Sequence, residues 1–293
     1  MIGEAATVAF LGFPRTGKST YLGALWQLAQ DPEEPTIVER DVTGDRSYLQ
    51  ELGDRVARGE EIERTRTASD DGMQLTLGLG TGDIVVDIPD LGGETLRLLV
   101  EERVWHSRLQ ETLVACDAMV LFLHPERLRM PMSIAMADEV LADHRASQGR
   151  DASEAGVEQR GDSGAETQPP EFRRGLACTA AQCVDALENV LMHQRARWPI
   201  RLAVVISAWD TVDGSPTPAH WLADRVPALG SFARSNADMI EWNLYGVSAQ
   251  GGTLPADREE LLARGSVRRR VFARSADGHP VPLVEPLRWV LGN

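Results

Sequence analysis

Residues 8–20 read VAFLGFPRTGKST, four apolar residues that run into the pattern G-x-x-x-x-G-K-S. An apolar helical pattern follows over residues 21–30. A strand before this pattern and a helix after it are the surroundings that a Walker A phosphate-binding loop requires. We therefore predict that the backbone amides of the loop, together with the N-terminus of the following helix, bind phosphate groups.

The residue types in this loop suit the chemistry of phosphate and magnesium. Gly12 and Gly17 allow tight turns that direct N–H groups at phosphate oxygens, Lys18 can reach the β- and γ-phosphates, and the Ser19 hydroxyl can ligate Mg²⁺. The alternative is a glycine-containing turn capped by Ser or Thr. The residues predicted to bind the nucleotide here are Gly12, Pro14, Arg15, Thr16, Gly17, Lys18, Ser19 and Thr20.

Composition excludes several classes of partner. The chain has 293 residues, with 30 Lys and Arg against 44 Asp and Glu, so its formal net charge is −14. Such a surface repels nucleic acid, and we predict no nucleic-acid partner. We also predict no transmembrane segment and a cytoplasmic location, because no apolar run approaches ~20 residues and the N-terminus does not resemble a signal peptide. The three cysteines lack metal-ligand spacing and are predicted to be buried, reduced thiols: Cys116, Cys178 and Cys183.

Strand and helix patterns alternate along the chain, which predicts an α/β fold with a mostly parallel sheet covered by helices on both faces. The predicted strands cover residues 73–79, 84–88, 118–123, 200–206 and 243–247. The predicted helices cover residues 21–30, 46–58, 95–115, 177–197, a segment after Pro218, and 286–291.

We interpret residues 1–293 as a single domain with two additions. Residues 148–170 contain almost no large apolar side chain, so they cannot bury enough surface to offset the entropy of ordering, and we predict a disordered insertion. Residues 253–293 are predicted to be a C-terminal extension that ends in a docking helix.

Further candidate ligands follow other predicted strands, and the carboxyl ends of parallel strands meet at one edge of a sheet. After residues 84–88 come Asp90, whose carboxylate can hold Mg²⁺ opposite Ser19, and Gly93, whose N–H can approach a γ-phosphate. Asp87 competes for the metal role in another register of the motif. We favour Asp90 because D-x-x-G is then intact and is followed by Glu94.

In their order, these motifs resemble those of the Ras-like, translation-factor-related (TRAFAC) class of P-loop GTPases. The resemblance extends from residue 12 to residue 249, and the D-x-x-G-E ending resembles the bacterial double-GTPases of conflict-system operons. It implies a small-GTPase-like fold, GTP and GDP as ligands and Mg²⁺ as cofactor. It further implies that Asp210 pairs with guanine N1 and the exocyclic amine, and that Ser248 and Ala249 support guanine O6.

The fourth motif departs from the usual Asn-Lys-x-Asp. Ser207 and Ala208 replace Asn and Lys, so the Lys stem that covers the base is absent. Trp209 is a candidate for stacking near the base instead. Guanine recognition therefore depends mainly on Asp210.

The candidate catalytic residues are Lys18, Thr65 and Glu94. We predict Thr65 as the switch threonine that meets Mg²⁺ and the γ-phosphate; Thr67 is also suitably placed, and Thr43 is less suitable because a helix intervenes. Glu94 stands where many relatives carry a water-positioning Gln. A carboxylate accepts hydrogen bonds but donates none, so Glu94 either orients the water as a base or marks slow intrinsic turnover.

These observations predict a Mg²⁺-dependent switch that binds and hydrolyses GTP and signals to a protein effector or operon partner. Two alternatives stay open. A nucleotide-holding scaffold without useful turnover is consistent with the altered fourth motif and with Glu94. An ATP-dependent P-loop phosphotransferase would share the phosphate loop.

Overall fold

The computed structural model describes residues 5–62, 73–80, 82–88, 93–131, 174–193 and 199–292. Within these ranges one mixed sheet has the strand order β2-β3-β4-β1-β5-β6-β7-β8-β9. The strands are β1 (Ala6–Leu11), β2 (Val38–Thr43), β3 (Met73–Gly78), β4 (Asp83–Ile88), β5 (Ala118–Leu123), β6 (Ile200–Ile206), β7 (Ile240–Ser248), β8 (Phe272–Ser275) and β9 (Pro280–Val281).

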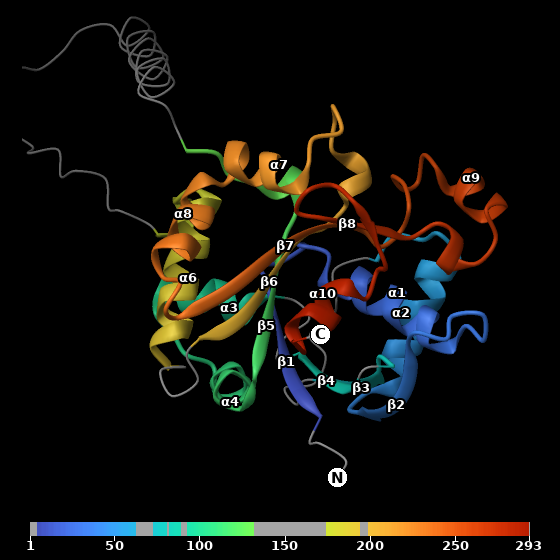
Figure 1. Ribbon diagram of the computed structural model, residues 1–293, viewed down its shortest axis with the longest axis horizontal. Helices are drawn as coiled ribbons and strands as arrows, with labels where there is room; N and C mark the ends of the chain where they lie inside the picture. Colours follow the sequence, from blue (N-terminus) through green and yellow to red (C-terminus); the bar gives the residue numbers. More distant parts are fainter. Residues whose placement is uncertain are drawn as a thin grey trace, which may run out of the picture.

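The helices connect and cover these strands (Figure 1). They are α1 (Lys18–Gln30), α2 (Arg46–Ala57), α3 (Glu94–Glu102), α4 (Ser107–Ala115), α6 (Thr179–His193), α7 (Pro218–Arg225), α8 (Pro227–Ser235), α9 (Arg258–Ala263) and α10 (Glu285–Val290). Within the described ranges, no helix has the length and apolar character needed to cross a membrane.

The centre of the sheet is parallel and its two sides are antiparallel. Strands β4, β1, β5, β6 and β7 run parallel to one another, whereas the pairs β2–β3 and β3–β4 on one side, and β7–β8 and β8–β9 on the other, are antiparallel. The predicted α/β fold with a mostly parallel central sheet is confirmed.

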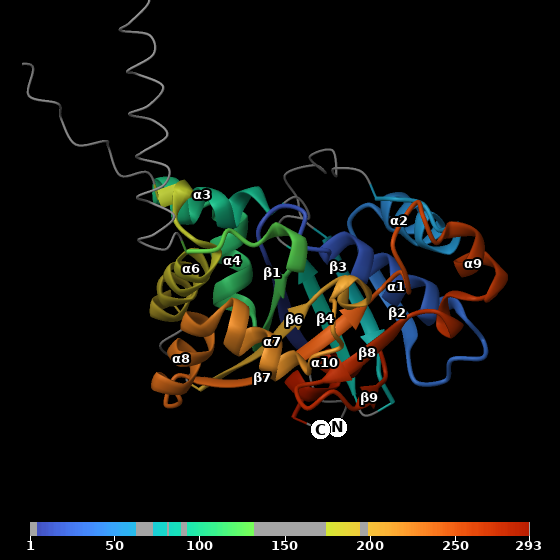
Figure 2. The same ribbon diagram turned by 90° about the horizontal axis from the view of Figure 1, so that it is seen from above.

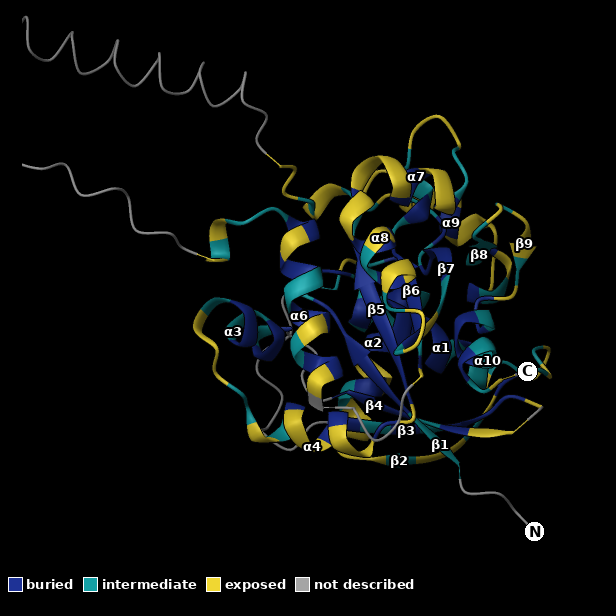
Figure 3. Cartoon of the chain, turned by 60° about the vertical axis from the view of Figure 1, so that its left-hand side comes forward, coloured by how far each residue is buried: buried dark blue, intermediate teal, exposed yellow. Residues whose placement is uncertain are grey.

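Two hydrophobic cores lie on the two faces of the sheet, because alternate residues of a strand point to opposite faces. In β1, Val8 and Phe10 join the core under α1, α2 and α10, whereas Ala9 and Leu11 join the core under α3, α4, α6 and α8. Figures 1 and 2 show α1 and α2 on the side opposite α3, α4, α6 and α8. The central strands are buried while the outer faces of the helices are exposed (Figure 3).

Residues 95–115 do not form one helix, and that prediction is wrong. Helix α3 ends at Glu102 because Arg103 adopts a left-handed backbone with φ of 59°, and α4 begins at Ser107. The Arg103 guanidinium donates to both oxygens of Asp185 in α6, at 2.8 and 2.6 Å. The apolar period continues through the break, so the sequence pattern does not reveal it.

Three strands were not predicted. Strand β2 is an edge strand with four exposed residues, so it lacks the apolar alternation by which strands are recognised. Strands β8 and β9 are only four and two residues long. They lie in residues 253–293, and α10 from the same region packs against β5, β6 and β7. Residues 148–170 lie outside the described residues, as does the end of the predicted helix beyond residue 193.

Two of the cysteines, Cys116 and Cys183, are buried, and Cys178 is half-buried; all three are free thiols. Burial raises the pKa of the Cys183 thiol to about 12. The predicted burial is confirmed for Cys116 and Cys183, whereas Cys178 is only partly buried.

Candidate nucleotide-binding site

The loop between β1 and α1 is folded by its own backbone and by one buried lysine. Gly17 has φ of 89°, in the left-handed region that favours glycine, and a Cβ at this position would lie 2.8 Å from the Cβ of Ser207. The Lys18 side chain is 3% exposed, and its Nζ donates to the carbonyls of Gly12 at 2.8 Å and Phe13 at 3.1 Å. Thr16 Oγ1 also donates to the Phe13 carbonyl, at 2.8 Å. The lysine therefore holds the loop curved around its own ammonium group.

A cavity of about 720 Å³ opens beside this loop, at the edge where the parallel strands end. This volume is in the usual range for a small-molecule or cofactor site. The predicted site residues that line it are Pro14, Arg15, Thr16, Gly17, Lys18, Ser19, Thr20, Glu94, Asp210 and Ala249. These residues come from the loop before α1, the first turn of α1, the start of α3 and the segments that follow β6 and β7. The fold thus brings together segments that are almost 240 residues apart in the chain.

The remaining described site residues support the cavity without lining it. Gly12 supplies a carbonyl to Lys18, and Ser248 is buried, with its Oγ accepting a hydrogen bond from the Gly251 N–H at 2.9 Å. Gly93 has φ of 75°, and a Cβ there would lie 2.5 Å from the Gly12 carbonyl oxygen. The backbone at the start of α3 therefore rests directly against the phosphate loop.

Thr65, Thr67 and Asp90 lie outside the described residues, so their roles stay predictions. Asp87 is described, and it is engaged elsewhere. Its buried carboxylate accepts from Arg108 Nη2 at 2.8 Å and from Gln74 Nε2 at 2.9 Å. Asp87 is not among the residues that line the cavity, and this arrangement favours a structural ion pair with α4 over a metal ligand.

The fourth motif places Asp210 at the cavity and Trp209 in the protein core. Trp209 is absent from the cavity lining, and its ring lies edge-on to that of Trp221, with centroids 6.3 Å apart and planes at 76°. The expectation that Trp209 stacks near the base is therefore wrong. The reason is tertiary: Gly246 on β7 leaves room for the indole, which the sequence alone does not show.

Glu94 begins α3 and is held by the next turn of the same helix. Its Oε2 accepts from Arg97 Nε at 2.7 Å, and Arg97 Nη1 donates to Glu101 at 2.8 Å. The pKa of Arg97 is raised, chiefly by its hydrogen bond to Glu94. In this conformation the Glu94 carboxylate has a cationic partner three residues along the helix.

Several lining residues were not predicted from the sequence. His124 directly follows β5, and its Nδ1 accepts a hydrogen bond from the Glu126 N–H at 3.2 Å; burial lowers the pKa of the His124 ring. The position of His124 directly after a buried strand could have predicted from the sequence that it lies at the cavity. Gln250 also lines the cavity just after β7, whereas Glu61, Ile62 and Leu254 follow no such rule, because loops bring them there.

Comparison with known proteins adds the family. A family model described as Double-GTPase 1 matches residues 9–290. No curated protein matches the chain.

The solved structures to which this chain is similar match it at low sequence identity. One is a bacterial selenocysteine-specific elongation factor, EF-Sec (TM-score 0.35, 13% identity, covering 91% of this chain and 28% of that chain). Another is the signal recognition particle receptor SRb-GTP/SRX complex from Chaetomium thermophilum (TM-score 0.37, 14% identity, 88% and 96%). The chain thus spans little more than a quarter of the elongation factor. The family match covers nearly the whole chain and agrees with the resemblance in the motifs: the protein belongs to the Double-GTPase 1 family.

Proposed function

We propose that this GTPase is a Mg²⁺-dependent switch whose nucleotide state is read by a protein partner in the cytoplasm. The observation that carries the proposal is the contact between Gly93 and Gly12, because it joins the start of α3 to the phosphate loop. A γ-phosphate bound in the loop would meet the N-terminus of α3. Binding and loss of that phosphate would then bias the position of an element on the protein surface.

Magnesium fits the donors that the loop supplies. Ser19 lines the cavity and directly follows Lys18 in the chain, and a hydroxyl oxygen is a hard ligand of the kind Mg²⁺ prefers. Among the described residues, no three His, Cys, Asp or Glu side chains could hold a metal between them. We propose that Ser19, Thr65 and Asp90 hold the ion jointly with the phosphates, and that Mg²⁺ neutralises phosphate charge there.

Guanine recognition is assigned to the far end of the same cavity. Asp210 would accept from N1–H and from the exocyclic amine of guanine, while the loop containing Ser248 and Ala249 would support O6. Ser248 Oγ fixes the turn at Gly251, and Ala249 lines the cavity. An adenine offers no matching pair of donors to the carboxylate, so Asp210 would favour GTP over ATP.

Lys18 is the only lysine in the sequence, so a reagent that labels lysine tests the phosphate-loop assignment at a single position. An acyl phosphate of GTP carries an electrophilic carbonyl; attack by the Lys18 amine would form an amide and release GTP. We expect peptide mass spectrometry to find this label on Lys18, with excess GTP but not ATP preventing it. Lys18→Arg is the matched control that should lose the label, with the N-terminal amine as internal reference. Label on the N-terminus alone would contradict the phosphate-loop assignment, and equal protection by ATP would contradict guanine selectivity.

Base recognition is tested separately by Asp210→Asn. Xanthine has a carbonyl where guanine has its amine, so the new amide can donate to XTP, whereas the original carboxylate would repel it. A lost charge-assisted hydrogen bond costs about 1.5–3 kcal/mol, and we expect GTP affinity to fall about ten- to hundred-fold. Titration calorimetry with GTP and XTP measures the change. An unchanged preference would make Asp210 an ordinary loop acid.

A further inference from the structure

The fourth motif lacks the Asn and Lys of its relatives, yet Asp210 still lies at the cavity. Ser207, in place of Asn, is bonded to β5: both its N–H and its Oγ donate to the Leu123 carbonyl, at 2.8 and 3.0 Å. Ala208, in place of Lys, has no polar group in its side chain. Neither side chain reaches forward to fix Asp210, so another group must set its direction.

We infer that Trp209 is this positioning residue: its indole, seated in a notch made by Gly246 and Trp221, sets the direction of the Asp210 carboxylate. The inference rests on the proposed reading of guanine by Asp210. It concerns a side chain that points away from the nucleotide, and it assigns base selectivity in part to contacts in the protein core.

The fit of the indole against β7 is close. Trp209 is 8% exposed, and a Cβ on Gly246 would lie 2.4 Å from Cδ2 of the indole. This distance is far below a carbon–carbon contact, so the ring occupies the place where any other residue would carry its side chain. Trp221 of α7 closes the other side in the edge-on geometry that aromatic pairs favour.

The backbone conformation of residues 208–211 links the position of the Trp209 indole to the direction of the Asp210 side chain. Trp209–Thr211 form one turn of 3₁₀ helix, in which successive side chains point about 120° apart. The turn is closed onto Ala208, whose carbonyl accepts from the N–H of Thr211 at 3.0 Å and from its Oγ1 at 2.9 Å. Ala208 itself has φ of 46°, a left-handed conformation that is unfavourable for a non-glycine residue. With Trp209 fixed in the core, the next side chain of this turn is directed at the cavity.

The test compares GTP with inosine triphosphate, which keeps N1–H but lacks the exocyclic amine. If Asp210 binds that amine, the wild-type protein prefers GTP by about tenfold or more. Gly246→Ala pushes the indole out of its notch, and Trp209→Ala removes it. Gly82→Ala is the matched control, because a Cβ there meets nothing within 4 Å. Trp209→Phe keeps a ring in the notch and serves as the conservative variant.

We expect Gly246→Ala and Trp209→Ala to bring the ratio of GTP to inosine triphosphate affinity close to one, with kcat at saturating GTP nearly unchanged. Trp209→Phe and Gly82→Ala should keep most of the wild-type ratio. General loosening of the fold would weaken both nucleotides alike and leave the ratio intact, and that result overturns the inference. A wild-type protein without any preference overturns the role of Asp210 itself, which separates the two failures.

Discussion

At the scale of single residues, Glu94 and Arg97 form an ion pair at the start of α3, beside the cavity. Glu94 lines the cavity from the first residue of α3, and Arg97 Nε binds its carboxylate at 2.7 Å. If this carboxylate must reach the attacking water, hydrolysis first has to break the ion pair. An exposed pair of this kind is worth up to about 1 kcal/mol. The presence of Arg97 would then lower the rate of GTP hydrolysis.

We therefore predict that Arg97→Ala raises the single-turnover rate of GTP hydrolysis about two- to fivefold, the change in barrier that such a pair allows. Phosphate release from pre-bound GTP measures it. Glu101→Ala is the control, because it removes the other partner of Arg97 and leaves the bond to Glu94 in place. A slower Arg97→Ala variant would show that the arginine assists the reaction. If phosphate release took hours in all variants, the protein would be a nucleotide-holding scaffold.

At the scale of elements, two hydrogen bonds join the segment that follows β5 to the start of α6. The Arg129 N–H donates to Thr179 Oγ1 at 2.8 Å, and the Thr179 N–H donates to the Arg129 carbonyl at 2.9 Å. The residue that begins α6 therefore lies beside the segment that follows β5.

Deletion of residues 148–170 is predicted to leave nucleotide affinity and the melting temperature nearly unchanged. Residues 148–170 contain almost no large apolar side chain that could be buried, and each halving of a loop changes its closure free energy by only ~0.6 kcal/mol. Calorimetric melting and GTP titration of the shortened chain measure the effect. Replacement of the same residues by a Gly-Ser linker of equal length is the control. A fall of many degrees in both variants would mean that this stretch packs against the core.

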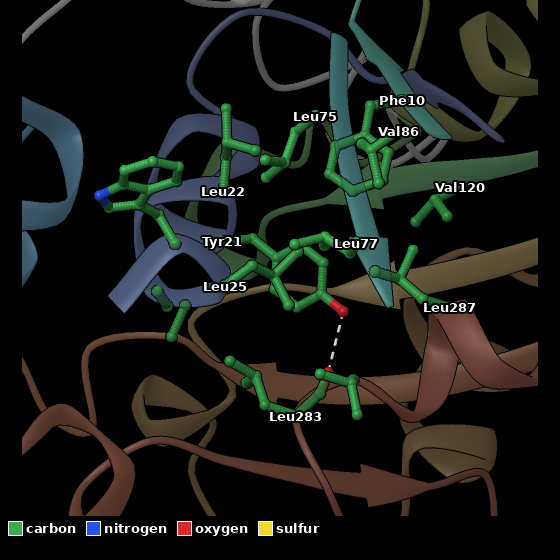
Figure 4. Packing of buried hydrophobic residues seen from close by; sticks show 14 of the residues in the cluster. Phe10, Tyr21, Leu22, Leu25, Leu75, Leu77, Val86, Val120, Leu283 and Leu287 are labelled. Carbon is green, nitrogen blue, oxygen red and sulfur yellow. Dashed lines mark hydrogen bonds between the residues drawn. The ribbon is translucent and has the colours of Figure 1, made fainter. Parts of the chain in front are cut away.

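At the scale of the whole molecule, the C-terminal residues complete the core beneath the phosphate loop. Tyr21, in the first turn of α1, donates through its hydroxyl to the Leu283 carbonyl at 2.8 Å, and Leu287 of α10 belongs to the same buried cluster (Figure 4). Burial raises the pKa of Tyr21 far above its ordinary value, so the phenol stays protonated as the donor. Leu283 and Leu287 thus pack beneath α1, the helix that follows the phosphate loop.

Leu287→Ala should lower the free energy of unfolding by about 2–5 kcal/mol, because Leu287 is 0% exposed and its removal leaves a cavity. Urea denaturation, followed by circular dichroism, measures this loss. Leu262→Ala on α9 is the matched control: Leu262 is 40% exposed, and a change there should stay within about 0.5 kcal/mol. Equal midpoints for the two variants would show that residues 253–293 are a peripheral extension.

The sequence by itself determined those features whose signals are local. The phosphate loop has a fixed spacing of Gly, Lys and Ser, and the buried parallel strands are continuous apolar runs, so both were predicted close to their observed bounds. The position of Asp210 and Ala249 after such strands was enough to place them at one cavity, because parallel strands end at a common edge.

Tertiary structure decided the features that depend on what a residue packs against. The direction of Trp209 depends on a missing side chain at Gly246, the pairing of Asp87 depends on Arg108 in α4, and the end of α3 is marked by Arg103, which pairs with Asp185 in α6. Each contact joins residues more than 20 positions apart, where periodicity carries no information. In each case the neighbours that the fold brings against a side chain, rather than its own type, set its direction and its role.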